Sequence, residues 1–510
     1  MTKFTVFFLL FLQVQLSVGE DSYDDNHAKV LIIGAGAAGL QAAKFLHDKG
    51  MDDMIIIEGA DFYGGRVHDV PFAGARVEIG ANWAQPPGTS IIDTVTRLNI
   101  DYHESDFDSI VVRNETGDNV NDEADPIWEE LEVALDKIAE IGTELNDQCR
   151  PDISIRAALR VAGWIPKTPI HKTIESFDFD FEWADIPEVT SLKSTVPIQK
   201  ISSGGGNLFI NDQGGFKRIF EEITPWLEMD PFQNHLRLNK TVTSIDDTSA
   251  DGVEVTCADG TKYTGDYALV TVGLGVLQRD VVTFKPVLPD WKIEKFYQFI
   301  MGSFAKIFIK FPRQFWDNEE WILYASERRG YYPVFNNLNA PNVFAGTPNI
   351  LVAFVTGDEA RRIQSQPAAE TKAEVEAVMR KMYPDLSTPP PDASEIFITD
   401  WDTNPLHYGA YSNWPVEVST EAFEQIQSRV GNIFFAGEHT DPVYNGYIIG
   451  ATQSGEREAS KILSCMNGDE CPAYTPPDKY TCGEKGSALG LGANIQTVLG
   501  LVLLVITLFM

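Results

Sequence analysis

The sequence predicts an α/β fold, and residues 29–66 carry the observations that predict it. An apolar run from Lys29 to Ile33 has the length of a fully buried strand. A helical apolar pattern follows and stops at Gly50. A second apolar strand, 54–57, comes next. This order of strand, turn, helix and strand is typical of a Rossmann-like unit.

Three glycines between the first strand and the helix, Gly34, Gly36 and Gly39, have G-x-G-x-x-G spacing. The first permits a tight turn, the second lets the backbone approach a pyrophosphate, and the third lets the helix lie close to the strand. The helix N-terminus presents free N–H groups and a positive dipole end to phosphate. The spacing alone is a weak signal, but its strand–turn–helix–strand context favours a bound dinucleotide over a glycine-rich turn without ligand.

The second strand ends in Glu58, which is placed to accept hydrogen bonds from an adenosine ribose. An acid there favours an unphosphorylated ribose, and so NAD or FAD rather than NADP. Gly64, Gly65 and Arg66 follow shortly afterwards. An NAD site does not need a second glycine pair and arginine, whereas the diphosphate of FAD can be held from two sides. The sequence therefore predicts FAD.

With these residues the chain resembles the flavin-containing amine oxidase family, most closely its secreted plant-type polyamine oxidases, over about residues 28–471. Further motifs occur in the family's order: a flavin-facing loop at 77–83 that contains Gly80, a lysine-bearing strand at 304–308, and a closing flavin motif at 434–440 that contains Glu438, followed by 444–447. The resemblance implies an FAD-binding Rossmann-like domain and a discontinuous, mixed α+β substrate domain.

The strands that would hold the cofactor occur in separate blocks, so we expect discontinuous domains. The FAD-binding domain is predicted at 28–105, 196–291 and 400–471, and the substrate-binding domain at 106–195 and 292–399. The elements expected outside the first block are strands at 242–245, 266–273, 305–310 and 350–355, and helices at 127–145, at 371–382 and after Gly446.

The two ends of the chain carry targeting signals. Residues 1–19 contain one cation, a short apolar run and small residues, which indicate a secretory signal peptide rather than a membrane anchor. The tail at 472–510 contains small residues at 486–488, a spacer and an apolar end, which favour a GPI-anchor signal over a tail helix. We therefore expect an extracellular or cell-surface protein attached to the membrane through its C-terminus.

Secretion gives meaning to two glycosylation sequons, at Asn114 and Asn239. Asn114 lies in a polar, acidic stretch and is the better candidate. Asn239 precedes the strand at 242–245, and the sequence leaves open whether it is buried. The charge of −34 over 510 residues argues against binding of nucleic acid. It would concentrate a polycationic substrate, although solubility alone also explains an acidic chain.

Five cysteines are too few for a disulfide-scaffolded fold, and their spacing suggests no metal site. The resemblance implies a disulfide between Cys465 and Cys471. It assigns no partner to Cys149, Cys257 or Cys482.

The resemblance also implies the reaction. FAD removes hydride equivalents from the carbon beside an amine nitrogen, water hydrolyses the imine to an aldehyde and an amine, and molecular oxygen becomes hydrogen peroxide. Lys306 matches the family lysine that holds a water against the flavin. The alternative is a charge that points outward from an alternating strand, because Lys310 shares a face with Lys306.

Several other residues take roles by the same resemblance. Tyr411 and Tyr447 match the two aromatic positions that flank the substrate nitrogen, and Trp401 and Val242 match positions beside the flavin. Ala410 stands where monoamine oxidases carry the cysteine that links their flavin. We therefore expect a non-covalent FAD.

Glu182 matches a carboxylate that faces the polyamine. The chain departs from the plant-type pattern at Gln85, where a second carboxylate is expected, and at Phe304, where a tyrosine is expected. The substrate prediction therefore includes spermine, spermidine and their acetylated derivatives. The alternatives are an oxidase of another primary or secondary amine and a non-catalytic flavin-binding surface protein. An L-amino-acid oxidase and a nuclear histone demethylase are disfavoured, and the oligomeric state is not predicted.

Overall fold

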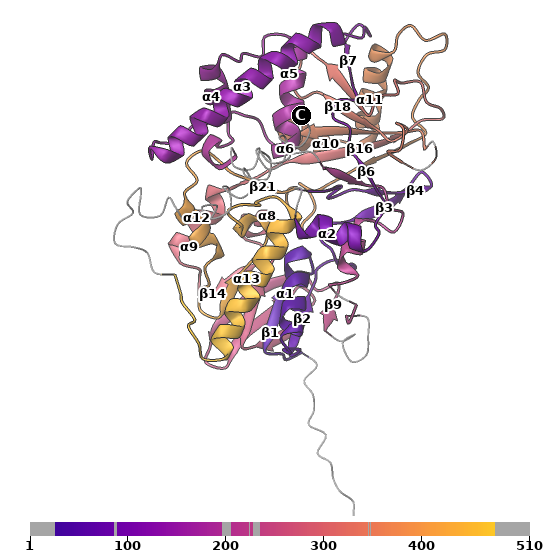
Figure 1. Ribbon diagram of the computed structural model, residues 1–510. Coiled ribbons are helices and arrows are strands. Elements are labelled where there is room, and N and C mark those ends of the chain that lie inside the picture. Colours follow the sequence, from indigo (N-terminus) through magenta and orange to yellow (C-terminus); the bar gives the residue numbers. More distant parts are fainter. Residues whose placement is uncertain are drawn as a thin grey trace, which may run out of the picture.

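A computed structural model describes residues 26–85, 89–195, 206–223, 225–227, 235–344, 346 and 348–474. The predicted signal peptide and the apolar end of the tail lie outside these residues. Within them, no helix is long and apolar enough to cross a membrane. The first block folds as predicted, into β1 (Val30–Ile33), α1 (Ala37–Asp48) and β2 (Met54–Ile57), at the lower end of the molecule in Figure 1.

A five-stranded sheet contains both of these strands, in the order β22 (Ile433–Phe435), β13 (Tyr267–Val270), β1, β2 and β9 (Leu236–Arg237). Every neighbouring pair is parallel. Parallel strands need long crossover connections, so the sheet collects strands from three stretches that are far apart in the chain. The predicted α/β fold class is confirmed.

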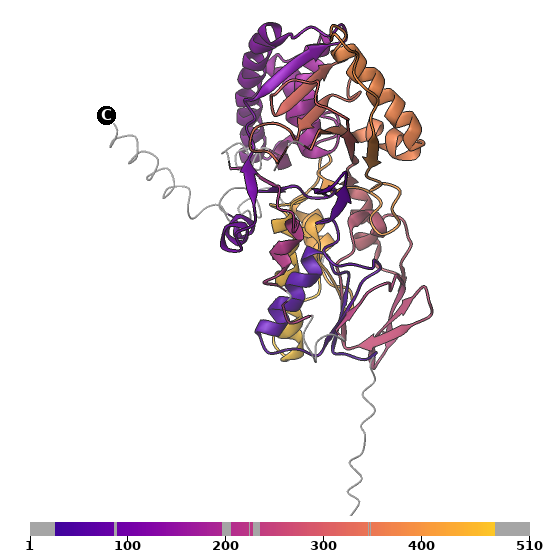
Figure 2. The ribbon, with the colours of Figure 1, turned by 90° about the vertical axis from the view of Figure 1, so that its right-hand side faces the viewer.

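Two helices from opposite ends of the chain cover one face of this sheet. Helix α13 (Ile448–Met466), the predicted helix after Gly446, lies beside α1, as both views show (Figures 1 and 2). A Cβ atom at Gly455 would lie 2.1 Å from the carbonyl oxygen of Ala38, so the two backbones cross in close contact. Their small residues, among them Ala42 and Ala459, are buried against the sheet.

A four-stranded sheet packs against the other face of the parallel sheet. Its order is β12 (Lys262–Gly265), β11 (Gly252–Cys257), β10 (Val242–Ser249) and β14 (Thr283–Lys285). Apolar side chains of its strands, such as Ile245 and Val255, are buried in one cluster with Leu31 and Ile55 of the parallel sheet. Helices α1 and α13, the parallel sheet and this second sheet form three layers. The glycine loop follows β1 of the middle layer.

A six-stranded sheet forms the other half of the molecule. Its order is β20 (Glu395–Ile398), β16 (Phe304–Lys310), β19 (Ile350–Thr356), β18 (Val334–Asn337), β17 (Trp321–Ala325) and β7 (Ile110–Asn114). Neighbouring strands are antiparallel except β17 and β7. All six lie in the segments predicted to bind substrate, although the domain boundaries themselves stay a prediction.

Helices lie on both faces of this sheet, as Figure 2 shows. On one face α10 (Gly357–Ser365) and α11 (Ala368–Met382) bury side chains with Ile307 and Ile309 of β16. On the other lie α3 (Asn121–Asp147), α4 (Ile155–Ala162) and α5 (Pro169–Glu175). Because side chains alternate along a strand, Phe304, Lys306 and Phe308 face this second side.

Shorter elements connect the layers. They are β3 (Asp69–Phe72), β4 (Ala75–Glu78), β5 (Trp83–Ala84), α2 (Ser90–Arg97), β6 (Tyr102–Glu104), α6 (Phe181–Trp183), β8 (Leu208–Ile210), α8 (Leu274–Leu277), α9 (Asp290–Gln298), β15 (Ile300–Met301), β21 (Ser412–Asn413) and α12 (Thr420–Gln427). A π-helix, which the sequence did not predict, is formed by Ser176–Asp180 (η1) between α5 and α6.

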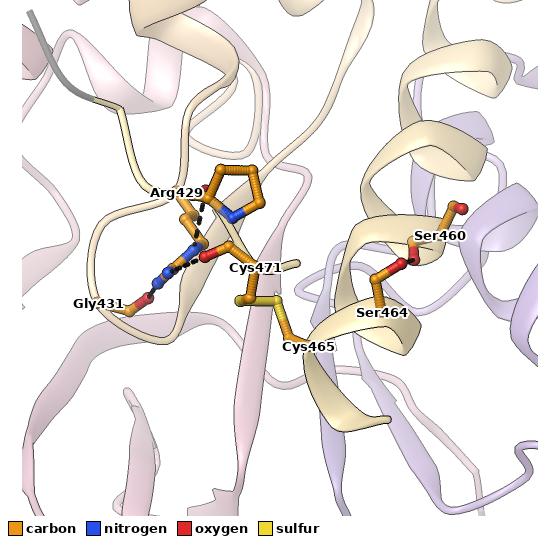
Figure 3. Close-up of a disulfide and its surroundings, with 7 residues drawn as sticks. Arg429, Gly431, Ser460, Ser464, Cys465 and Cys471 are labelled. Atoms are coloured by element: carbon orange, nitrogen blue, oxygen red, sulfur yellow. Dashed lines mark hydrogen bonds between the residues drawn. A yellow bond between two sulfur atoms is a disulfide. The ribbon is translucent and has the colours of Figure 1, made fainter. Parts of the chain in front are cut away.

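The disulfide between Cys465 and Cys471 is confirmed, with Cα atoms 4.8 Å apart. Figure 3 shows it at the end of α13, where Arg429 donates a hydrogen bond of 2.6 Å to the carbonyl oxygen of Cys471. Cys149 is also disulfide-bonded. Cys257 is a free, buried thiol.

The two sequons differ in accessibility, in the opposite order to the sequence-based preference. The side chain of Asn239 is exposed, in a turn before β10. Asn114 is partly buried, and its side-chain amide donates a hydrogen bond of 3.0 Å to Asp118. Glycosylation at either position stays a prediction, with Asn239 the more accessible acceptor.

Candidate active site

A cavity of about 1620 Å³ extends from the glycine loop after β1 to helix α3, between the two halves of the molecule. Almost every residue that the sequence singles out lines it. These are Gly34, Gly36, Glu58, Arg66, Gly80, Gln85, Glu182, Val242, Phe304, Lys306, Trp401, Tyr411, Glu438 and Tyr447. The exception is Gly39, which lies beneath the glycine loop. Proximity to this cavity is established for these residues, and their individual roles stay predictions.

The glycine loop has the geometry that a diphosphate requires. Gly34 has a φ of +111°, which glycine adopts readily. A Cβ at Gly39 would lie 2.0 Å from the carbonyl oxygen of Gly34, so only glycine permits this approach of helix to strand. A Cβ at Gly36 would meet no atom within 4 Å, because Gly36 opens onto the cavity. The loop therefore leaves room for phosphate at the N-terminus of α1.

Glu58 lies at the end of β2, beside this loop. Its carboxylate accepts hydrogen bonds of 2.7 Å from the Ala35 amide and 2.8 Å from the Ala60 amide. Burial raises the pKa of Glu58, while these backbone donors act in the opposite direction. Each carboxylate oxygen has a further lone pair, so Glu58 can still accept a bond from a ribose hydroxyl.

An ion pair joins the three segments around the inner part of the cavity. Arg66 donates hydrogen bonds of 2.9 Å to Glu438 and 2.8 Å to the carbonyl oxygen of Ala410. The Glu438 carboxylate also accepts bonds from the Ser412 hydroxyl and, at 2.9 Å, from the Gly446 amide. Burial opposes its ionisation, but the charge of Arg66 and these donors hold the pKa of Glu438 below its usual value.

Lys306 points into the cavity from β16, so the alternative of an outward charge is wrong. Its Nζ donates to the carbonyl oxygens of Glu78 and Gly80 at 2.9 and 2.7 Å, and to Oδ1 of Asn82 at 3.1 Å. These acceptors use all three donors of an ammonium group. Burial lowers the pKa of Lys306 well below its usual value. Lys306 therefore holds the flavin-facing loop at the wall of the cavity.

Glu182 lies between the two predicted tyrosines. Tyr447 donates its hydroxyl hydrogen to the Glu182 carboxylate, and Tyr411 donates, at 3.0 Å, to the Glu182 carbonyl oxygen. The rings of Phe304 and Tyr411 have centroids 6.1 Å apart. Burial raises the pKa of Glu182, which the hydrogen bond from Tyr447 opposes. An aromatic wall with one partly buried carboxylate results. Nearby, Trp401 donates to the carbonyl oxygen of Ile79 at 3.2 Å.

The structure adds acidic residues that the sequence reasoning missed. Asp178, on η1, lines the cavity. So do three exposed acids of α3, namely Asp125, Glu132 and Asp136. Their spacing of seven and four residues places them on one side of a helix, which the sequence could have revealed.

Comparison with known proteins fits this geometry. Residues 37–463 match the family described as "Flavin containing amine oxidoreductase". The chain belongs to the flavin-containing amine oxidoreductase family. It is 38% identical over 476 residues to "Polyamine oxidase 1" of Zea mays, which covers 89% of this chain and 93% of that protein. It is 36% identical over 506 residues to "Polyamine oxidase 6" of Oryza sativa subsp. japonica, which covers 95% and 99%.

A more distant similarity is to "Lysine-specific histone demethylase 2" of Homo sapiens, at 27% identity over 475 residues, 88% of this chain and 55% of that protein. The resemblance to amine oxidases and to plant polyamine oxidases is therefore confirmed. Membership of this flavin family makes the protein an oxidoreductase with FAD as its cofactor. The glycine loop, Glu58, and the pair of Arg66 and Glu438 provide a site that fits FAD.

Proposed function

We propose that this flavin amine oxidase acts on polyamines, at a carbon beside an amine nitrogen, and produces an aminoaldehyde, an amine and hydrogen peroxide. Bound FAD supplies the redox chemistry, because it accepts two electrons from the substrate and gives them to oxygen. Water then adds to the resulting imine and the carbon–nitrogen bond breaks. The polyamine oxidases of Zea mays and Oryza sativa subsp. japonica support this proposal through their similarity over most of the chain.

One observation carries the proposal: a single cavity extends from the glycine loop after β1 to several carboxylates. Glu182 and Asp178 line it, and so do Asp125, Glu132 and Asp136 of α3. A polyamine carries several ammonium groups separated by methylene chains. Carboxylates spaced along the cavity match that pattern of charges, and they also attract cations from solution.

The surrounding residues suit the reacting amine. Tyr411, Tyr447 and Phe304 form aromatic walls that exclude water and orient the nitrogen. Gln85, which lines the same cavity, can donate or accept hydrogen bonds but has no charge. This substitution favours polyamines with fewer charges, such as acetylated forms, as alternative substrates.

A panel of amines tests the proposal. Purified holoprotein is mixed anaerobically with spermine, spermidine, their acetylated derivatives and a simple monoamine, and bleaching of the flavin absorbance is followed. We expect the polyamines to bleach the flavin fastest, and identification of the aldehyde and amine will show which bond breaks. Bleaching by monoamines alone would indicate another amine oxidase, and bleaching by none would indicate a flavin-binding protein without this activity.

We also propose a secreted protein that is held at the cell surface by a GPI anchor. Support comes from the apolar N-terminal run, from the small residues and apolar end of the tail, and from the Cys465–Cys471 disulfide. Disulfides persist in the oxidising secretory compartments. Detection of the protein on intact cells by surface labelling tests this location.

A further inference from the structure

Four carboxylates between residues 175 and 182 divide into two pairs. Glu175 and Asp180 are not part of the cavity lining, and they accept hydrogen bonds of 2.9 and 2.7 Å from Arg329. Both are buried. Asp178 and Glu182 instead line the cavity. One short segment therefore presents one pair of acids to an arginine and the other pair to the substrate space.

The π-helix η1 explains this division. An α-helix turns about 100° per residue, so two residues five apart would lie about 140° apart around its axis. A π-helix has i→i+5 hydrogen bonds, which bring residues five apart onto one side. Glu175 and Asp180 can then share Arg329, while Asp178 and Glu182 take the opposite side. Such π-helical turns occur frequently at functional sites.

Asp178 differs from the other three acids because it has no partner. Arg329 compensates Glu175 and Asp180, and Tyr447 donates to Glu182. In the described parts of the chain, no hydrogen bond or cation reaches the carboxylate of Asp178, and its charged neighbours are Glu182 and Glu175. Burial and these two acids raise the pKa of Asp178 to about 7. A carboxylate in this position favours a cation that enters from the cavity.

The position of Asp178 along the cavity follows from its neighbour Phe177. The Phe177 ring contacts Trp128 of α3, with centroids 6.1 Å apart, and Phe181, with centroids 5.9 Å apart. All these residues line the cavity. Asp178 therefore belongs to the stretch of cavity lining in which η1 and Phe181 meet α3.

We propose that Asp178 is a cation subsite that, with Glu182, binds an ammonium group of the substrate remote from the reacting nitrogen, and that it supplies the charge that Gln85 lacks. The inference rests on the proposed polyamine oxidation and assigns a specificity role to a residue that the sequence did not single out. An acetylated amine at this position has no charge, so Asp178 should favour the free polyamine.

Replacing Asp178 by Asn tests the subsite, with steady-state kinetics on spermine and on monoacetylated spermine. We expect KM for spermine to rise about tenfold, as for loss of one charge-assisted hydrogen bond, with little change in kcat. Asp178→Glu keeps the charge and should restore most of the affinity. Glu129→Gln removes one charge from an exposed position of α3 outside the cavity lining and should change neither constant.

FAD content and thermal unfolding establish that each variant is folded, and Asp178→Ser serves as a second charge-removing variant. An unchanged KM for spermine in a folded Asn or Ser variant overturns the proposal. So does an equal loss in Asp178→Glu, because that would indicate packing rather than charge. Failure of the unaltered protein to oxidise any polyamine is a separate result, which overturns the proposed function instead.

Discussion

At the scale of single residues, the position of Lys306 determines what its replacement should do. Its ammonium group donates to three acceptors of the loop 78–82, and it is 4% exposed. No atom of the glycine loop is among those acceptors. The lysine therefore acts at the inner end of the cavity, away from the diphosphate site.

Lys306→Met should slow turnover while FAD stays bound. The variant loses the group that donates to three acceptors of the loop 78–82, so this wall of the cavity should shift, and we expect a decrease of roughly 10²-fold in kcat. Rapid-reaction measurements of flavin reduction and of reoxidation by oxygen, together with the FAD content, test this. Wild-type rates for both half-reactions would show that the assigned role is wrong.

Gln85 and Glu182 allow a matched pair of charge changes. Gln85→Glu should tighten the binding of spermine relative to its acetylated form by roughly 1 kcal/mol, about fivefold, because a partly screened ion pair is added. Glu182→Gln should change the ratio in the opposite direction. The measurement is the ratio of kcat/KM values for the free and acetylated substrates at one pH and ionic strength. If neither change alters the ratio, these side chains do not face the amine.

His439 should make the stability of the protein sensitive to acid. Its ring is 1% exposed, and neither ring nitrogen has a partner among the described residues. Burial lowers the pKa of His439 from 6.5 to about 4, although Glu438 opposes this shift. The unfolded chain therefore takes up the proton first as the pH falls. Stability is fully present above pH 6.5 and is lost as the pH falls toward 4, by about 3 kcal/mol.

Thermal unfolding of His439→Gln between pH 7 and 4.5 tests this expectation. Tm should fall less steeply with acidification in the variant than in the unaltered protein. His27 is exposed, so His27→Gln is the control and should leave the slope unchanged. Parallel curves for His439→Gln and the unaltered protein would contradict the assignment.

At the scale of elements, the crossing of α1 and α13 holds the cofactor half together. α1 follows the glycine loop directly, and α13 begins just after Tyr447 and contributes Ile448 and Ala451 to the cavity lining. The 2.1 Å that separates a Cβ at Gly455 from the Ala38 carbonyl oxygen leaves no room for a side chain. The contact is between backbones, so a flexible side chain cannot relieve it.

Gly455→Ala should lower the free energy of unfolding by roughly 1–3 kcal/mol, because the helices must separate to admit the methyl group. FAD affinity should fall as well, since α1 carries the phosphate site. Ser460→Ala, at an exposed position of the same helix, is the control and should change neither quantity appreciably. Denaturant unfolding and FAD titration measure both effects. A variant as stable as the unaltered protein would show that the helices can readjust.

At the scale of the whole molecule, the described fold ends well before the end of the chain. α13 ends at Met466, and every residue that lines the cavity precedes Met466 in the sequence. The candidate anchor lies beyond this point, outside the described residues.

A chain that ends after Lys485 should therefore be secreted in soluble, active form. The full chain should instead remain on the cell surface until a phosphatidylinositol-specific phospholipase releases it. Amine-dependent peroxide production in medium and on cells measures both forms. Resistance to the phospholipase, together with a retained C-terminal peptide, would favour a tail helix over a GPI anchor.

The sequence by itself determined the α/β class, the FAD loop and the family, because these depend on residues that are close together in the chain. The spacing of Gly34, Gly36 and Gly39 specifies one turn, and its physical requirements are local. Short family motifs likewise identified site residues that, apart from Gly39, all line the cavity. The periodicity of the strand could not show whether Lys306 is buried or exposed. The loop that accepts its hydrogen bonds lies more than two hundred residues away in the sequence.

Only the tertiary structure decided which of the acids at 175–182 pair with an arginine and which line the cavity. Asp178, Asp180 and Glu182 occur in one short stretch, and nothing in their order separates a paired acid from an unpaired one. Arg329, which is distant in sequence, pairs with Asp180, and the π-helix turns Asp178 toward the cavity. A buried carboxylate depends on which charges surround it, and those charges come from segments that meet only when the chain folds.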